Sequence, residues 1–251
     1  MDSFFLNLPV QKHTNTINYQ SKLLLVGSCF VENIGDKLDY FKFQQYTNPF
    51  GIIFHPKAIL KLIERCVQLK LYNENDLVFH NEQWHCFEVH STLSTPNKNE
   101  LLEKLNLTLK NTHEYLKNTN NVILTFGTAW GYVFKQKDLW VANCHKIPQR
   151  EFDKKLSSME DLSSTYAQIF DLLLSLNPKL TIITTVSPVR HIKDGIVENN
   201  QSKAHLLASL HSTLKNYSKA YYYPAYELIA VSYTHLRAHE TELHLVCRLL
   251  L

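Results

Sequence analysis

Short, continuously apolar runs alternate along the chain with longer stretches in which apolar residues recur every three or four positions. A continuous apolar run bounded by turn-forming residues is typical of a buried strand, whereas the longer spacing is typical of an amphipathic helix. The pattern predicts strands at 22–26, 41–46, 121–126, 180–186 and 220–223, and helices at 30–38, 56–69, 99–117, 158–176 and 199–216. A weaker β-region is expected at 77–79 and 83–89, and a hairpin at 132–141.

This alternation predicts a single α/β domain. Strands separated by helices form parallel βαβ units, which place helices on both faces of one parallel sheet. We therefore expect one three-layer α/β domain over residues 1–231 of the 251. Residues 232–251 do not continue the pattern, because they end on an apolar run without a helix cap or a polar terminus.

Composition narrows the classes of partner. The chain has 26 basic and 23 acidic residues, a formal charge of +3, and no run of Lys or Arg. A nucleic-acid or membrane-surface partner is therefore not indicated. No signal peptide and no apolar stretch of about 18 to 20 residues is found, and the five cysteines are scattered and odd in number. We expect a cytoplasmic protein without a membrane segment, and no cofactor is implied.

Chemistry is expected where the parallel strands end, because ligands of open α/β sheets bind outside the carboxyl ends of the strands. Small and polar residues follow each strong strand there. They are Gly27-Ser28, Thr47-Asn48 with Gly51, Gly127-Thr128, and Ser187 with Arg190-His191.

Ser28 is the strongest candidate for a nucleophile. It stands between a strand and a helix, where a turn would expose its hydroxyl and direct the first N–H groups of the helix toward the same point. Those donors could hold an oxyanion if a base removed the serine proton. The alternative is that Ser28 only caps the helix. Cys29 is a competing nucleophile, but free cysteines are usually buried, so we expect it to pack beneath the turn.

The histidines leave several interpretations open. His191, beside Arg190, could be a general base or a substrate contact, or it could simply be solvated. His145 follows Cys144, which is a weak metal signal without a second ligand pair. His239 and His244 are five residues apart, so they do not form a zinc His-Glu-x-x-His pair. No metal is expected, although a metal-dependent hydrolase using His85, His90, His145 or His191 is kept as a third hypothesis.

A series of short blocks resembles the GSCFA family from about residue 20 to residue 230. The blocks are Gly27-Ser-Cys-Phe30 with Glu32-Asn-Ile-Gly35, Asn48-Pro-Phe-Gly51, Trp84-His85, His90-Ser91, Leu124-Thr-Phe-Gly-Thr-Ala-Trp130, Asn143-Cys-His-Lys-Ile-Pro148, Thr185-Val-Ser-Pro-Val-Arg-His191, Ser202-Lys-Ala204 and Tyr222-Tyr-Pro-Ala-Tyr-Glu227. The family is mostly bacterial and similar to SGNH hydrolases, which are esterases and related acyl hydrolases. The resemblance implies a flavodoxin-like three-layer fold.

The resemblance also implies roles for single residues. Ser28 matches the nucleophile of the first SGNH block, and Gly51 stands where the second-block glycine donates to the oxyanion. Gly127 matches the third-block glycine. Ala129 stands in place of the third-block asparagine, so the oxyanion hole needs Asn48 or Asn143 as a substitute.

The C-terminus departs from the family. Members continue into an Asp-x-x-His-Pro segment that resembles the SGNH block supplying the acid and base. This chain instead runs Ser-Tyr-Thr-His-Leu-Arg-Ala-His-Glu-Thr from Ser232, a string that resembles a translated sequencing adapter. We expect residues 232–251 to be non-native, the domain to be C-terminally truncated, and the chain to be inactive for lack of the catalytic histidine.

Two functions therefore remain in view. The first is a serine-dependent esterase or O-acyl hydrolase acting on a small acylated or carbohydrate-like substrate, with Ser28 as nucleophile. Its pocket residues would be Cys29, Asn48, Gly51, Gly127, Thr128, Asn143, His145, Arg190 and His191. The second is a non-catalytic binding module that keeps the pocket, which the alanine at position 129 favours.

Overall fold

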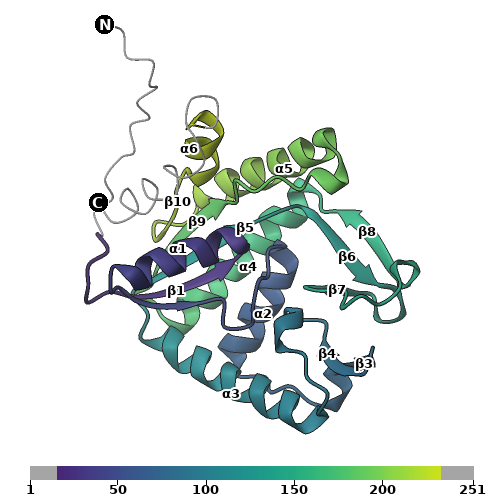
Figure 1. The fold of residues 1–251 in the computed structure, drawn as a ribbon. Coiled ribbons are helices and arrows are strands. Elements are labelled where there is room, and N and C mark those ends of the chain that lie inside the picture. The colour runs from purple at the N-terminus through teal and green to yellow at the C-terminus, as the bar shows by residue number, and fades with distance from the viewer. Residues whose placement is uncertain (1–15, 233–251) are drawn as a thin grey trace, which may run out of the picture.

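The computed structural model describes residues 16–232, and its centre is a five-stranded sheet (Figure 1). All four neighbouring pairs are parallel and the order is β10-β9-β5-β1-β2. Numbered among the strands of this sheet alone, that order is the 2-1-3-4-5 arrangement of flavodoxin-like folds. The strands are β1 (Lys22–Gly27), β2 (Gln44–Thr47), β5 (Asn121–Phe126), β9 (Thr181–Val186) and β10 (Ala220–Tyr222).

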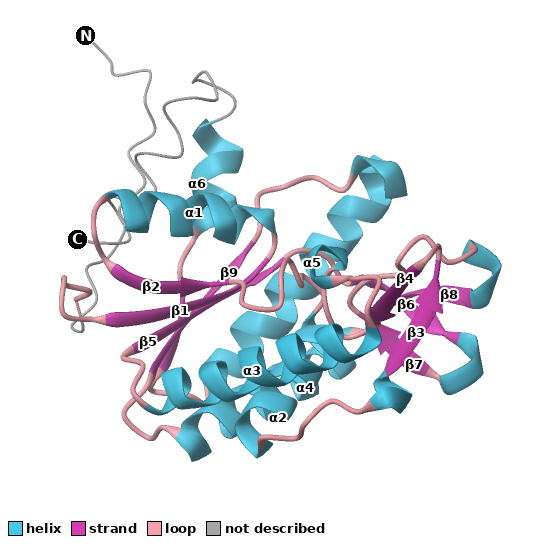
Figure 2. Cartoon of the chain, turned by 60° about the horizontal axis from the view of Figure 1, so that its bottom comes forward, coloured by secondary structure: helices cyan, strands magenta, loops and turns pink. Residues whose placement is uncertain are grey.

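Helices cover both faces of this sheet, as predicted (Figure 2). On one face Leu24 and Leu124 pack in a core that includes residues of α2 (Pro56–Gln68), α3 (Lys98–Lys117), α4 (Met159–Leu176) and α5 (Ile196–Leu214). On the other face Leu25 and Ile123 pack with α1 (Cys29–Tyr40) and α6 (Ala225–Ser232). Successive side chains of a strand point to opposite faces, and both faces are buried, so the strands read as continuous apolar runs.

Two small antiparallel sheets adjoin this central sheet. The weaker β-region forms β3 (Leu77–His80) and β4 (Gln83–Cys86). The predicted hairpin forms β6 (Trp130–Phe134) and β7 (Leu139–Val141), and β8 (Phe152–Leu156) pairs with β6. The sequence pattern did not predict β8, because three of its five residues are exposed and charged. Phe87, Phe134 and Phe152 form a separate small core here.

Element boundaries differ from the predictions by a few residues. The strand predicted from residue 41 begins at Gln44, because Phe41 caps α1 and Lys42 takes a left-handed backbone with φ of 65°. The helix predicted from residue 199 begins at Ile196. Short 3-10 turns lie at Glu74–Asp76, Ser91–Leu93, Lys135–Lys137, Gln149–Glu151 and Ile192–Asp194.

Most of the segment expected to be non-native, residues 233–251, lies outside the described residues, as do His235, His239 and His244. Between residues 16 and 232, no helix is both long and apolar enough to span a membrane.

Candidate functional site at the carboxyl edge of the sheet

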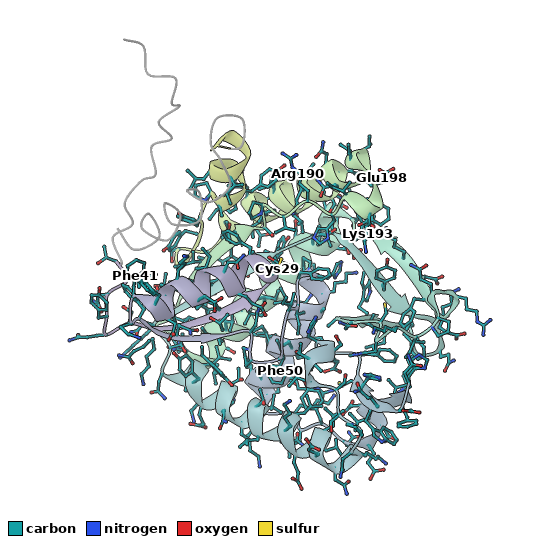
Figure 3. The ribbon with its side chains drawn as sticks, viewed as in Figure 1. Cys29, Phe41, Phe50, Arg190, Lys193 and Glu198 are labelled. Atoms are coloured by element: carbon teal, nitrogen blue, oxygen red, sulfur yellow. The ribbon has the colours of Figure 1, made fainter. Side chains whose placement is uncertain are left out.

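The order of the strands places a topological switch point between β1 and β5, where α/β sheets of this order bind ligands. Gly27 pairs with Thr125 at this edge, and Thr125 pairs with Thr185 of β9. The residues that follow these strands, Ser28, Gly127 and Ser187, therefore lie at one edge. Figure 3 labels Cys29 at the start of α1, and Arg190 and Lys193 in the segment after β9.

The Asn48-Pro-Phe-Gly51 turn is fastened to the end of β1. The Asn48 N–H donates to the Leu25 carbonyl oxygen at 2.9 Å, and the Asn48 side-chain oxygen accepts from the Gly27 N–H at 2.9 Å. Ile53 donates its N–H to the Gly27 carbonyl oxygen at 3.1 Å. The backbone of Gly27 is thus held on both sides by the segment that follows β2. This long-range pairing closes the corner in front of Ser28.

Asn48 itself has a left-handed backbone, with φ of 41°. Asparagine tolerates this region better than most residues. Its side-chain Nδ2 is buried and has no hydrogen-bond partner. Since the oxygen of the same amide is fixed on Gly27, Nδ2 is an unused donor beside the Ser28 corner.

Ser28 occupies the N-cap position of α1, but its hydroxyl does not cap the helix. The side chain is only 3% exposed, and Oγ has no hydrogen-bond partner. The expectation of an exposed hydroxyl is therefore wrong. The extended backbone at Ser28, with ψ of 175°, continues the strand by one residue into a corner closed by the 48–53 segment. The hydroxyl stays buried there.

Cys29 was expected to be buried, and the structure places it at the surface instead. It is exposed, and it is the first residue of α1 rather than a residue packed beneath the turn. The burial pattern of α1 explains this, because Phe30, Val31 and Ile34 form the face that packs on the sheet.

The glycines at the edge have their N–H groups occupied. Gly51 donates to the Asn48 carbonyl oxygen at 2.8 Å, and Gly127 donates to the Phe54 carbonyl oxygen at 2.8 Å. The Gly51 N–H is therefore not free to donate to an oxyanion in this structure. Asn48 Nδ2, by contrast, is free.

Thr128 connects the end of β5 to α5. Its hydroxyl lies 2.8 Å from the Ser202 hydroxyl, and Ser202 Oγ accepts from the Ala129 N–H at 2.7 Å. Thr128 also accepts from the Trp130 N–H at 3.0 Å. These contacts give Thr128 a role in holding α5 against the sheet edge.

Lys203 was not among the predicted site residues, although it lies at this edge. It is 2% exposed, and its Nζ donates to the carbonyl oxygens of Gly127 and Ser187, at 2.6 Å each. Burial lowers the pKa of Lys203 to about 7, while the nearby Cys29 opposes the shift. A lysine on the buried face of an amphipathic helix, next to Leu206, was the signal in the sequence that could have identified it.

His191 is half-buried in the segment after β9. Its N–H donates to Asn199 Oδ1 at 2.9 Å, its ring lies 5.5 Å from the Phe54 ring, and its Nε2 is buried without a partner. Burial lowers its pKa, the charge of Lys203 lowers it further, and Asp194 opposes both. His191 thus lies at the edge that was predicted for it, whereas the neighbouring Arg190 is exposed.

Asn143 and His145 belong to a different part of the molecule. Asn143 accepts from the His145 N–H at 2.8 Å, and His145 Nε2 lies 2.8 Å from the Cys86 carbonyl oxygen. The His145 ring stacks on His85 with a centroid distance of 4.6 Å. These contacts tie both residues to the β3–β4 hairpin. Asn48, rather than Asn143, is the asparagine bonded next to Ser28.

The histidines of this region do not form a recognisable metal site. His85 lies 2.6 Å from Ser94 Oγ and 2.9 Å from the His80 carbonyl oxygen, so both of its ring nitrogens have partners. His90 packs over Gly51 and caps Thr92. Over the part of the chain that the structure describes, no three His, Cys, Asp or Glu residues are grouped so that they could hold a metal ion.

The model of the GSCFA family matches residues 22–247, from the first residue of β1 through all the elements of the site. The chain belongs to the GSCFA family. The GSCFA match extends past Val231 into the segment that was expected to be non-native. No curated protein sequence matches the chain significantly.

Proposed function

We propose that this GSCFA protein is a serine-dependent esterase or O-acyl hydrolase of the SGNH type, with Ser28 as its nucleophile. The observation that carries the proposal is the pair of buried, unpartnered groups at the switch point, Ser28 Oγ and Asn48 Nδ2. Buried polar groups are usually hydrogen-bonded, so each unpartnered one calls for an explanation, and a catalytic role is one of these explanations.

In this proposal the two groups have complementary tasks. Ser28 Oγ attacks the carbonyl carbon of the ester, and Asn48 Nδ2 donates to the oxyanion that develops. The first N–H groups of α1 have no acceptor within the helix, and the positive end of the helix dipole favours negative charge at the same point. Asn48 then takes the place of the third-block asparagine, which is Ala129 here.

The substrate in this proposal is a small acylated or carbohydrate-like molecule. Arg190 is exposed and could contact a polar or charged group, and the adjacent His191 offers an unpartnered ring nitrogen. The resemblance to SGNH hydrolases assigns the base to a C-terminal Asp-x-x-His segment.

The second candidate is a non-catalytic binding module. The low exposure of Ser28, at 3%, favours it, because a substrate carbonyl does not reach a hydroxyl that is buried in this way. A binding module would keep the same unpartnered donors as ligand contacts.

A fluorophosphonate probe distinguishes the hydrolase from the binding module. The probe is applied to the 251-residue chain and to the chain with its C-terminal codons re-read from source DNA. Covalent labelling mapped to Ser28 by mass spectrometry, retained in Cys29→Ala and lost in Ser28→Ala, supports the hydrolase. A folded protein that is not labelled in either form favours the binding module. Labelling at Cys29 in place of Ser28 would reject Ser28 as the nucleophile.

A further inference from the structure

Lys203 is held at the sheet edge by backbone atoms alone. Its Nζ contacts the carbonyl oxygens of Gly127 and Ser187, the residues that follow β5 and β9. None of the ion pairs among residues 16–232 includes it. A buried ammonium without a carboxylate is costly, and such a group usually becomes neutral instead.

The number of acceptors fits a neutral amine. An ammonium has three N–H donors, whereas a neutral amine has two donors and one lone pair. Two carbonyl oxygens at 2.6 Å use both donors of the neutral form and leave the lone pair without a partner. Burial moves the pKa of Lys203 to about 7, so a large fraction of this amine is neutral near neutral pH.

The groups that face Lys203 come from three other elements. Cys29 of α1 raises the pKa of Lys203, and the Tyr226 ring of α6 lies with its centroid 5.9 Å from Nζ. His191 lies in the segment after β9, and the charge on Lys203 disfavours its protonated form. Asp194, from that same segment, acts on His191 in the opposite direction. Cys29 and the Tyr226 ring favour the charged ammonium, whereas burial favours the neutral amine and is the larger effect on the pKa of Lys203.

Ser28 lies at the same edge. It follows the Gly27–Thr125 pair directly, and Gly127 lies two residues beyond that pair on the neighbouring strand. Parallel strands are about 4.8 Å apart, so the carbonyl that binds Lys203 and the Ser28 corner belong to adjacent strand ends. Ser28 Oγ has no hydrogen-bond partner in this structure, so it is free to receive one from the Lys203 side or from a bridging water.

From this arrangement we propose that the Lys203 amine, rather than a C-terminal histidine, is the proton acceptor for the Ser28 hydroxyl, directly or across one water molecule. The inference rests on the proposed hydrolase function and names the base of that same site. It would make the 251-residue chain reactive on its own.

The protons balance through both half-reactions. As Ser28 Oγ bonds to the acyl carbon, its proton moves to the lone pair of Lys203, and the ammonium returns it to the departing alcohol. Water then adds to the acyl-enzyme and gives a proton to Lys203. The ammonium returns that proton to Ser28 Oγ as the carboxylic acid leaves. With a fluorophosphonate, the Oγ–P bond replaces the P–F bond, fluoride departs, and the proton passes to solvent.

The competing interpretation is that Lys203 only clamps the ends of β5 and β9 together. An arginine would keep the positive charge and the donors but could not accept a proton, since its pKa stays above about 12. Lys203→Arg therefore separates the two roles. Lys215→Arg, at the exposed end of the same helix, is the matched control.

The kinetic experiment measures the rate of fluorophosphonate labelling at Ser28 of the full 251-residue chain from pH 5.5 to 9.5. We expect the wild-type rate to rise through a midpoint near 7 and to level off. Lys203→Arg and Lys203→Met should be slower by about 100-fold at pH 8, within the usual range for a general base, and should lose that midpoint. Lys215→Arg should keep both the rate and the midpoint. A midpoint that persists in Lys203→Arg, or that moves only with His191→Gln, would overturn the proposal while leaving Ser28 as nucleophile.

A second measurement needs no reaction and no folded variant. With [13Cε]lysine, NMR follows each lysine of the wild-type chain, and the signal missing in Lys203→Arg or Lys203→Met identifies Lys203. A titration near 7 is expected, against about 10.4 for ordinary lysines. If no variant folds, one lysine signal titrating near 7 among the wild-type signals is the expected result, and its absence overturns the proposal. The hydrolase function itself would be rejected if the Lys203 signal titrated near 7 but the fluorophosphonate labelled neither the 251-residue chain nor the chain with its C-terminal codons re-read from source DNA. Labelling of only the re-read chain would show that Lys203 does not act as the base.

Discussion

The Asn48 side-chain oxygen accepts a hydrogen bond from the backbone N–H of Gly27 at 2.9 Å, joining two strand ends that are 21 residues apart in the sequence. The bond fixes the amide of Asn48 so that its Nδ2 stays buried and unpartnered next to Ser28. One side chain therefore both closes the corner after β1 and leaves a donor there. Its structural and chemical contributions can be separated by substitution.

Asn48→Ala should lower the free energy of unfolding by about 3 kcal/mol. The Gly27 N–H loses its partner, which costs about 1 to 3 kcal/mol for a buried group, and alanine at φ of 41° adds about 1 to 2 kcal/mol of backbone strain. Asn48→Gly loses the same hydrogen bond but accepts the left-handed backbone, so it should be less destabilised. Urea denaturation of both variants measures the difference. Equal loss in the two variants would contradict the assigned strain.

Gly27→Ala should destabilise the fold more than any other glycine substitution at this edge. A Cβ at Gly27 would lie 2.3 Å from the Thr125 carbonyl oxygen, a backbone atom of the neighbouring strand that cannot rotate away. We expect a loss of more than about 3 kcal/mol or failure to fold. Gly35→Ala is the comparison, because its Cβ would lie 2.4 Å from Thr47 Oγ1, which belongs to a side chain and not to the backbone, and alanine favours the helix by about 1 kcal/mol. Thermal unfolding should rank Gly27→Ala far below Gly35→Ala, and the reverse order would contradict the assigned contact.

Most of the fold could be predicted from the local sequence pattern, because the central strands are buried on both faces of the sheet. β1, β5 and β9 are buried at every residue except Lys22, and their predicted limits agree with the structure to within one residue. β8 escaped prediction because its three central residues, Asp153 to Lys155, are exposed and only Phe152 is buried. An edge strand with a polar face does not differ in composition from a loop.

The candidate site was harder to predict from the sequence than the fold, because it depends on contacts between segments that are distant in the sequence. Ser28 and Cys29 are adjacent, yet the first is buried and the second exposed, the reverse of what residue type and position indicated. The pairing of residues 48–53 with Gly27 closes the corner at Ser28, and no local pattern encodes this pairing. The contacts of Lys203 are also non-local, since its two acceptors, Gly127 and Ser187, follow β5 and β9.

Cys29 should react with a thiol reagent such as DTNB much faster than Cys66, Cys86 and Cys144. Cys29 is exposed, whereas burial raises the pKa of Cys66 and of Cys86 to about 12 and that of Cys144 to about 11. The thiolate is the reactive form. A Cys247→Ser background removes the cysteine that lies outside the described residues. At pH 8 we expect one fast equivalent that disappears in Cys29→Ser. A fast equivalent that survives this substitution would contradict the exposure of Cys29.

The stability of the protein should fall as the pH drops from 7 to 5 because two histidines are buried in the neutral form. Burial lowers the pKa of His55 and of His145 to about 4 each, from about 6.5 when unfolded. Since the unfolded chain binds these protons first, the stabilisation is complete above about pH 6.5 and is lost as the pH falls toward 4. The loss between pH 7 and 5 is about 2 kcal/mol per histidine.

Denaturation at each pH, repeated with His55→Gln and His145→Gln, tests the assignment. Each variant should show a smaller fall between pH 7 and 5, whatever its stability at pH 7, because glutamine does not titrate. The exposed His211 is the control, and His211→Gln should keep the wild-type slope. His55 contributes through a specific geometry as well, since its Nδ1 caps α2 at Lys57 while Nε2 lies 3.3 Å from the Ala129 carbonyl oxygen. Protonation removes the Nδ1 acceptor, so acid should also loosen the first turn of α2, and faster amide exchange at Lys57 in wild type near pH 5 is the expected local signal. An unchanged slope in both glutamine variants would mean that these histidines are accessible to protons in the folded protein.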